Sequence, residues 1–166
     1  MKKPGVTIDI PGGGRRQFRF LVSDFTGTLS RDGRLTPGVR PALTQLSKRM
    51  DVHVITADTF GTVRRALVRL PLAIHHLRGP GGDHDRQKRA FVRTFDLRNV
   101  VALGNGKNDR LLLKAVHQGG GLAIAVDNGE GCALDALRNA NVFISNAANA
   151  LALLLEPNRL KATLRN

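Results

Sequence analysis

Short apolar runs alternate along the chain with segments whose apolar residues recur at helical spacing. The runs are rich in β-branched residues, and each has the length of one strand. Strands are predicted over residues 6–10, 18–23, 52–56, 72–77, 100–103, 122–126 and 142–145, and helices over 37–50, 61–70, 86–95, 109–118, 131–140 and 147–155. This alternation predicts an α/β fold with three layers, a Rossmann-like parallel sheet flanked by helices.

The N-terminal part departs from the alternation. The segments 6–10 and 18–23 stand on either side of the turn sequence PGGG at residues 11–14. Proline and glycine favour tight turns, so an N-terminal β-hairpin that leads into the sheet is predicted. A glycine-rich phosphate loop is the alternative interpretation of the same residues.

Length and composition narrow the class of protein. A chain of 166 residues fits one domain with its own core, so a single domain over residues 1–166 is predicted. Apolar residues make up 42% and charged residues 23%, which excludes a disordered or fibrous chain. Cys132 is the single cysteine, which excludes an internal disulfide framework. Without a span of ~20 apolar residues or a signal core, a cytoplasmic protein with no membrane partner is expected.

The charge balance points to anionic partners. There are 26 Lys and Arg against 13 Asp and Glu, a formal net charge of +13. Such a chain attracts phosphates, nucleic acids or acidic lipids, so an anionic macromolecule is a candidate partner. The basic residues are spread through the chain, which favours solvated helix faces over one binding groove. There is no Trp or Tyr to stack on single-stranded bases.

The candidate chemistry follows three of the predicted strands, because ligands of a doubly wound sheet bind beyond the carboxyl ends of its strands. Asp24 follows the strand 18–23 and begins the turn DFTGTL. A carboxylate there can act as a nucleophile or a metal ligand. An Asx-turn or a helix cap is the alternative.

Two further strand ends carry oxygen donors and backbone N–H groups. The strand 52–56 ends in TADTFG, where Thr56 and the following residues offer an anion site at the start of a helix, with an ordinary N-cap as the alternative. The strand 100–103 ends in GNGKND, where Asn105, Asn108 and Asp109 supply the hard oxygen donors that suit magnesium.

In this order, DFTGTL, TADTFG and GNGKND resemble motifs I, II and IV of the haloacid dehalogenase-like phosphohydrolase superfamily. Within it, DFTGT is similar to the aspartyl-phosphate motif of P-type ion-pumping ATPases. The chain most resembles the small soluble P-type-ATPase-like phosphatases. The resemblance extends from about residue 6 to the C-terminus and lacks the membrane helices and the nucleotide-binding insertion of the pumps.

The resemblance implies roles for individual residues. Asp24 would be the nucleophile that forms aspartyl-phosphate, with Thr26, Thr56 and Lys88 as further catalytic residues. Lys88 would be the basic residue of motif III, and Arg86 and Arg89 are its close competitors. The phosphate-binding set would be Asp24, Gly27, Thr56, Ala57, Lys88 and Asn108.

Magnesium is the implied cofactor. Its ligands would be Asp24, the backbone carbonyl of Thr26, Asn105 and Asp109, the last either directly or by orienting Lys88 and a metal-bound water. Asn105 stands where most of the superfamily has Asp, which weakens the expected metal affinity. Thr26 stands where typical family phosphatases have an acid–base Asp, and losing such a group costs typically 10²–10⁴-fold in rate. Slow turnover is therefore expected.

The gaps between these motifs are too short for a cap domain, so we expect an open site that can accept bulky substrates. The predicted activity is a magnesium-dependent phosphohydrolase, a phosphatase or an ATPase-like enzyme, acting on a phosphorylated small molecule or a nucleotide. One alternative is a self-phosphorylating or phosphate-binding regulatory module. The other is a basic nucleic-acid-binding protein on the same scaffold.

Overall fold

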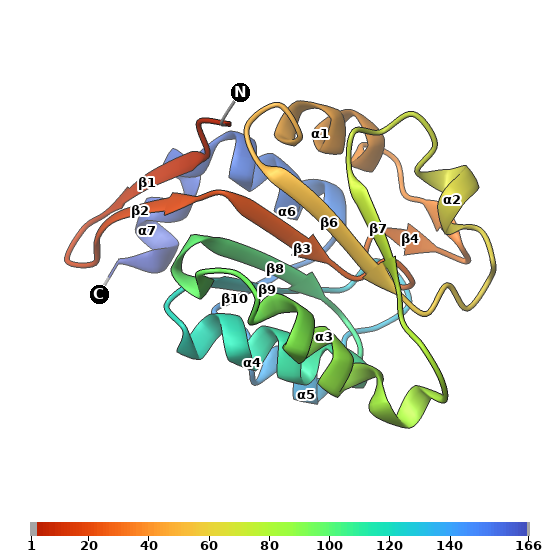
Figure 1. Ribbon diagram of the computed structural model, residues 1–166. Helices are drawn as coiled ribbons and strands as arrows, with labels where there is room; N and C mark the ends of the chain where they lie inside the picture. Colours follow the sequence, from red (N-terminus) through yellow and green to blue (C-terminus); the bar gives the residue numbers. More distant parts are fainter. Residues whose placement is uncertain (1–2, 166) are drawn as a thin grey trace.

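Six parallel strands form the middle layer of the fold (Figure 1). In the computed structural model, which describes residues 3–165, they lie in the order β10-β9-β8-β3-β6-β7. Their bounds are β3 Phe20–Ser23, β6 Asp51–Thr56, β7 Ala73–His76, β8 Val100–Gly104, β9 Leu122–Val126 and β10 Val142–Ile144. The chain runs from β3 outward to β7 and then from β8 outward to β10. The predicted doubly wound α/β fold is confirmed.

Helices cover both faces of this sheet (Figure 1). One face carries α1 (Val39–Leu46) and α6 (Ala147–Leu155), and the other carries α3 (His84–Val92), α4 (Arg110–Gln118) and α5 (Leu134–Leu137). The short helix α2 (Val63–Ala66) lies beside β7 at one edge. Successive residues of β3 point to opposite faces, so Leu21 joins the core under α1 and α6 while Val22 joins the core under α3 and α4.

The N-terminal hairpin is present, but its second arm differs from the prediction. Strand β1 (Val6–Ile10) pairs with β2 (Gly14–Phe18), and the two form a separate antiparallel sheet. The arm predicted over 18–23 is wrong, because the chain leaves the hairpin at Phe18 and enters the main sheet at Phe20. The sequence of β2 is GRRQF, and because most of it is polar, the apolar pattern does not predict this strand. The C-terminal helix α7 (Lys161–Leu164) packs against β1.

A second small hairpin follows the Asp24 turn, and the apolar pattern does not predict it. Its strands are β4 (Ser30–Arg31) and β5 (Arg34–Leu35). Asp32 and Gly33 join them with φ angles of 50° and 72°, the left-handed backbone that an Asp-Gly turn supplies. Two-residue strands are too short to show a period.

No cap domain is inserted between β3 and β6 or between β6 and α3. Between β3 and β6 the chain holds only the β4–β5 hairpin and α1, and between β6 and α3 it holds only α2, β7 and the short 3₁₀ helix Gly81–Asp83. None of the helices in the described part of the chain is long and apolar enough to cross a bilayer.

Candidate active site

The three sequence motifs lie at the same edge of the sheet, because β3 stands between β8 and β6. Ser23, the last residue of β3, pairs with Leu103 on one side and Val54 on the other. The backbone N–H of Asp24 then donates to the Leu103 carbonyl at 3.1 Å. The carboxyl ends of the three neighbouring strands therefore meet at Asp24, as the sequence predicts.

A buried ion triad forms the centre of the site. Lys88 of α3 donates through Nζ to Asp24 Oδ1 at 2.9 Å and to Asp109 Oδ1 at 2.6 Å. Lys88 and Asp109 are fully buried, and Asp24 is 4% exposed. Of the three basic candidates, Lys88 is the one that forms an ion pair with Asp24. The exposed Arg86 faces Asp83 instead. The buried Lys88 ammonium thus holds the two carboxylates together.

The triad sets the charge states of its members. Burial raises the pKa of the Asp24 carboxyl to about 6; the Asp109 carboxylate adds to the rise and Lys88 opposes it. Burial alone would lower the pKa of the Lys88 ammonium, but the charges of Asp109 and Asp24 outweigh it and raise the pKa. Lys88 therefore stays a cation beside Asp24 across the physiological range.

Asp109 uses both of its oxygens within the fold. Oδ1 accepts from Lys88, and Oδ2 accepts from the backbone N–H groups of Asn105 at 3.0 Å and Gly106 at 2.9 Å. These contacts fix the loop after β8 and hold Lys88 in place. Three donors thus hold the Asp109 carboxylate, an arrangement that suits the orienting role; its role toward a metal stays a prediction.

A carboxylate oxygen of Asp24 and the amide oxygen of Asn105 both lie near the hydroxyl of Thr28. Thr28 Oγ1 lies 3.4 Å from Asp24 Oδ2 and 3.0 Å from Asn105 Oδ1. Asn105 Nδ2 donates to the Gly131 carbonyl at 3.1 Å, while Oδ1 accepts from Thr28. The hydroxyl Oγ1 of Thr26 is buried without a hydrogen-bond partner in residues 3–165. The Thr28 hydroxyl therefore brings a carboxylate and an amide oxygen together after β3, and the same turn holds an unpaired hydroxyl.

This donor set fits a magnesium ion that has few protein ligands. Nowhere in the described chain do three His, Cys, Asp or Glu side chains gather as a metal-binding group. Magnesium prefers hard oxygens, commonly takes one or two carboxylates and keeps several waters. Asp24 supplies one carboxylate and Asn105 a further hard oxygen, which is enough for such a site. The metal-binding roles of these residues stay predictions.

Glycine is required at position 27. Its φ is +74°, and a Cβ there would lie 2.6 Å from Asn105 Nδ2, 2.9 Å from Glu130 Oε2 and 3.0 Å from Asn105 Oδ1. A side chain would therefore collide with polar atoms that approach from two other loops. The phosphate-binding role expected of Gly27 stays a prediction.

Solved structures with the same fold include several haloacid dehalogenase-like hydrolases. The 3-deoxy-D-manno-octulosonate 8-phosphate phosphatase of Moraxella catarrhalis, in complex with magnesium, phosphate and KDO, has a TM-score of 0.61 and 17% identity over 87% of this chain and 90% of its own. The cobalt-bound phosphatase of Haemophilus influenzae has a TM-score of 0.63 and 11% identity, covering 89% and 92%. A haloacid dehalogenase-like family protein of Streptococcus pneumoniae has a TM-score of 0.58 and 13% identity, covering 81% and 97%. At these identities the similarity concerns the fold.

Two proteins of Methanocaldococcus jannaschii are similar in sequence. The uncharacterized protein MJ0073 is 39% identical over 69 residues, which cover 42% of this chain and 70% of MJ0073. The chain belongs to the MJ0073 family. The uncharacterized protein MJ0072 is 36% identical over 39 residues, which cover 24% of this chain and 89% of MJ0072. No protein-family model matches the chain.

In this member of the MJ0073 family, the remaining expected site residues lie around the same sheet edge without touching the triad. Thr56 is buried at the end of β6, and its Oγ1 accepts from the Asp58 N–H at 2.9 Å. Ala57 is exposed, and Asn108 lines a shallow pocket next to Asp85. In the described chain no hydrogen bond joins Thr56, Ala57 or Asn108 to Asp24, so their phosphate-binding roles stay predictions.

Thr28 and Glu130 are site residues that the sequence analysis did not assign. Thr28 is part of DFTGTL, and its position two residues after Thr26 is the signal that could have found it. Glu130 comes from the loop after β9, outside the three motifs. Its Oε1 accepts from the backbone N–H of Asp32 at 2.6 Å, which ties that loop to the β4–β5 hairpin.

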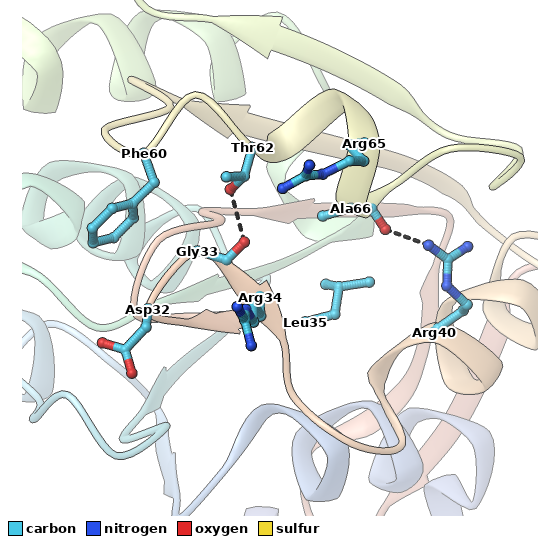
Figure 2. Close-up of a pocket in the computed structure, with 9 residues that line it drawn as sticks. All are labelled: Asp32, Gly33, Arg34, Leu35, Arg40, Phe60, Thr62, Arg65 and Ala66. Atoms are coloured by element: carbon cyan, nitrogen blue, oxygen red, sulfur yellow. Dashed lines mark hydrogen bonds between the residues drawn. The ribbon is translucent and has the colours of Figure 1, made fainter.

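A pocket of about 480 Å³ lies beside the site, between the β4–β5 hairpin and α2 (Figure 2). Thr62 Oγ1 donates to the Gly33 carbonyl at 2.7 Å and links the hairpin to the segment after TADTFG. Arg40 donates to the Ala66 carbonyl at the far side. The pocket is lined by Asp32, Gly33, Arg34, Leu35, Arg40, Phe60, Thr62, Arg65 and Ala66. Three guanidinium groups against one carboxylate make this a region that attracts anions.

Proposed function

We propose that this protein is a phosphohydrolase that transfers a phosphoryl group from its substrate to Asp24 and then to water. The observation that carries the proposal is the buried triad of Asp24, Lys88 and Asp109. Phosphoryl transfer needs a positioned nucleophile and fixed positive charge on the phosphoryl oxygens, and little else from the protein. Lys88 supplies that charge within hydrogen-bond distance of the nucleophile.

The reaction proceeds in two displacements. One Asp24 oxygen attacks phosphorus, the bond from phosphorus to the leaving oxygen breaks, and aspartyl-phosphate forms. Water then attacks that phosphorus, releases inorganic phosphate and restores the carboxylate. Lys88 Nζ keeps hold of Asp24 through both steps, while Asp109 keeps Lys88 in position. Thr56 and the backbone N–H of Gly27 bind the remaining phosphoryl oxygens.

Asp24, the Thr26 carbonyl and Asn105 would hold magnesium, which would supply further positive charge to the phosphoryl group. Thr26 has no ionisable side chain, so the leaving oxygen takes its proton from water. This absence predicts slow turnover and a long-lived aspartyl-phosphate.

The substrate class is a phosphorylated small molecule. The site has no cap domain over it, and phosphatases of the same fold are described as acting on an 8-phosphate sugar acid. The arginine-lined pocket beside the site favours substrates that carry a second anionic group. We place the activity in a single domain over residues 1–166, in the cytoplasm.

The test is phosphate release from a panel of sugar phosphates, nucleotides and p-nitrophenyl phosphate, with and without magnesium. Asp24→Asn should abolish magnesium-dependent release, and Asp96→Asn, an exposed acid in the turn before β8, should leave it unchanged. Stoichiometric labelling of Asp24 without turnover would instead favour the regulatory module. If neither turnover nor labelling occurs and salt-sensitive nucleic-acid binding survives Asp24→Asn, the phosphohydrolase proposal is wrong.

A further inference from the structure

Glu130 approaches the DFTGTL turn at Gly27, next to Asn105 of the candidate metal site. Its Oε2 lies 2.9 Å from the place where a Cβ on Gly27 would stand, and Asn105 Oδ1 lies 3.0 Å from the same place. Because position 27 is glycine, no side chain fills the space between these two oxygens. Asn105 Nδ2 is nearer still to that place, at 2.6 Å. The carboxylate and the amide therefore approach the DFTGTL turn at the same place.

Glu130 Oε2 is a carboxylate oxygen next to Asn105 that has no partner in the described part of the chain. Asp109 uses both of its oxygens on Lys88 and backbone N–H groups. Asp127 Oδ1 accepts from the backbone N–H groups of Gly129 and Gly131, at 2.9 and 3.0 Å. In residues 3–165, Glu130 Oε2 has no hydrogen-bond or ion-pair partner, while Oε1 is used by Asp32.

The loop that carries Glu130 is fixed in place. The 2.6 Å hydrogen bond from Asp32 N–H to Oε1 holds one oxygen of the carboxylate against the β4–β5 hairpin. The guanidinium of Arg31 lies over the neighbouring residue, since a Cβ on Gly129 would be 3.2 Å from its Nη1. Glu130 is exposed, but these contacts direct its second oxygen toward Gly27.

We propose that Glu130 is a further residue of the magnesium site, where its Oε2 binds the cation or one of its waters beside Gly27. Asn105 contributes an uncharged oxygen, so Asp24 is the one carboxylate among the ligands proposed so far. Glu130 raises that number to two, which is still within the one or two carboxylates that magnesium commonly takes. The choice of ion rests on the proposed function.

Metal affinity tests this inference without any need for turnover. Mn²⁺ serves as a spectroscopic probe: free Mn²⁺ is measured by electron paramagnetic resonance during titration, and Mg²⁺ is then added as competitor. Glu130→Gln keeps an oxygen acceptor for Asp32 N–H but removes the charge. It should weaken Mn²⁺ binding about 10–100-fold, the range seen when a group that orients metal ligands is lost. Glu156→Gln, which alters the one other glutamate, should leave the affinity unchanged.

Two further variants separate charge from loop anchoring. Asn105→Asp should tighten Mn²⁺ binding, and in the Glu130→Gln background it should recover most of the lost affinity, because it restores a second carboxylate. If Glu130→Ala weakens binding while Glu130→Gln does not, Glu130 only anchors the hairpin and the inference is wrong. Equal affinity in wild type and Glu130→Gln, or no Mn²⁺ binding by wild type, also overturns it.

The outcomes of the two proposals are distinguishable. If Asp24→Asn abolishes phosphate release but Glu130→Gln binds Mn²⁺ normally, only the inference about Glu130 fails. If wild type releases no phosphate from any substrate but Glu130→Gln still loses Mn²⁺ affinity, the proposed activity fails and Glu130 remains a metal-site residue.

Discussion

At the scale of single residues, the ionised Asp24 carboxylate that the proposed reaction needs lowers the stability of the folded protein. Burial raises its pKa from the ordinary 3.8 to about 6, so the fold favours the protonated form. The stabilising contribution is complete below pH 3.8 and is lost as the pH rises through about 6. Above that pH, two buried carboxylates share one cation, and the triad carries a net negative charge.

Asp24→Asn should therefore stabilise the protein at neutral pH. The substitution keeps the shape of the side chain, leaves Lys88 paired with Asp109 and makes the triad neutral. We expect the melting temperature to rise by about 2–4 °C at pH 7.5, the shift of roughly 1 kcal/mol for a domain of this size. Calorimetry without magnesium checks it, and the difference from wild type should disappear near pH 4. A lower melting temperature for the variant at pH 7.5 would contradict the argument.

The sequence predicted the residues of the triad but only part of their surroundings. Asp24 and Asp109 follow apolar strands and were found from the motifs, whereas Lys88 was assigned only through the family resemblance, with Arg86 and Arg89 as close competitors. Glu130 lies in no motif, and it approaches Gly27 only because β9 lies next to β8 and the loop after β9 is tied to Asp32. Such a contact depends on strand order and loop course, which local patterns do not determine.

At the scale of elements, apolar strands were predicted well and polar or very short ones were not. The strand 122–126 and the helix 147–155 have the bounds expected from their apolar residues. The helices predicted over 61–70 and 131–140 shrink to four residues each, at Val63–Ala66 and Leu134–Leu137. The first ends before Arg69, whose φ of 63° lies outside the helical region, and the second is followed by the polar residues Arg138 and Asn139, so the apolar pattern overestimated both lengths.

Strands β6 and β7 also bring together two histidines that are far apart in the sequence. His53 Nδ1 and His75 Nε2 are 3.1 Å apart, and Phe91 packs against both rings. Burial lowers the pKa of both imidazoles, and the neighbouring His75 lowers that of His53 further. The adjacent His76 points away to solvent, as strand alternation predicts.

This histidine pair should make the fold sensitive to mild acid. A lowered folded pKa means that the unfolded chain binds protons first, so stability falls as the pH drops through about 6.5, the ordinary value for histidine. His53→Phe should reduce the loss of melting temperature between pH 7.5 and pH 5, because phenylalanine cannot be protonated and fits the aromatic cluster. His117→Asn, at an exposed position on α4, is the matched control. An unchanged pH dependence in His53→Phe would rule out the pair as its source.

At the scale of the whole molecule, the excess of positive charge opposes folding. The chain has 26 basic and 13 acidic residues, and the acids Asp24 and Asp109 are committed to Lys88 inside the site. The arginines of the pocket beside α2 and those of the hairpin β4–β5 are exposed and close to one another. Compaction brings these like charges together, so self-repulsion is greater in the folded state than in the unfolded one.

Salt should therefore stabilise the fold. The screening length falls from about 10 Å at 0.1 M to about 3 Å at 1 M, so repulsion between exposed arginines weakens as NaCl is added. We expect the melting temperature to rise by several degrees between about 0.05 and 0.5 M NaCl, most steeply at the low end where screening changes fastest. Arg65→Gln removes one cation from the crowded pocket and should raise the melting temperature at low salt and flatten the salt dependence. A melting temperature that falls with NaCl would mean that attractive surface pairs outweigh the repulsion, although pairs as exposed as Arg98 and Asp96 contribute little.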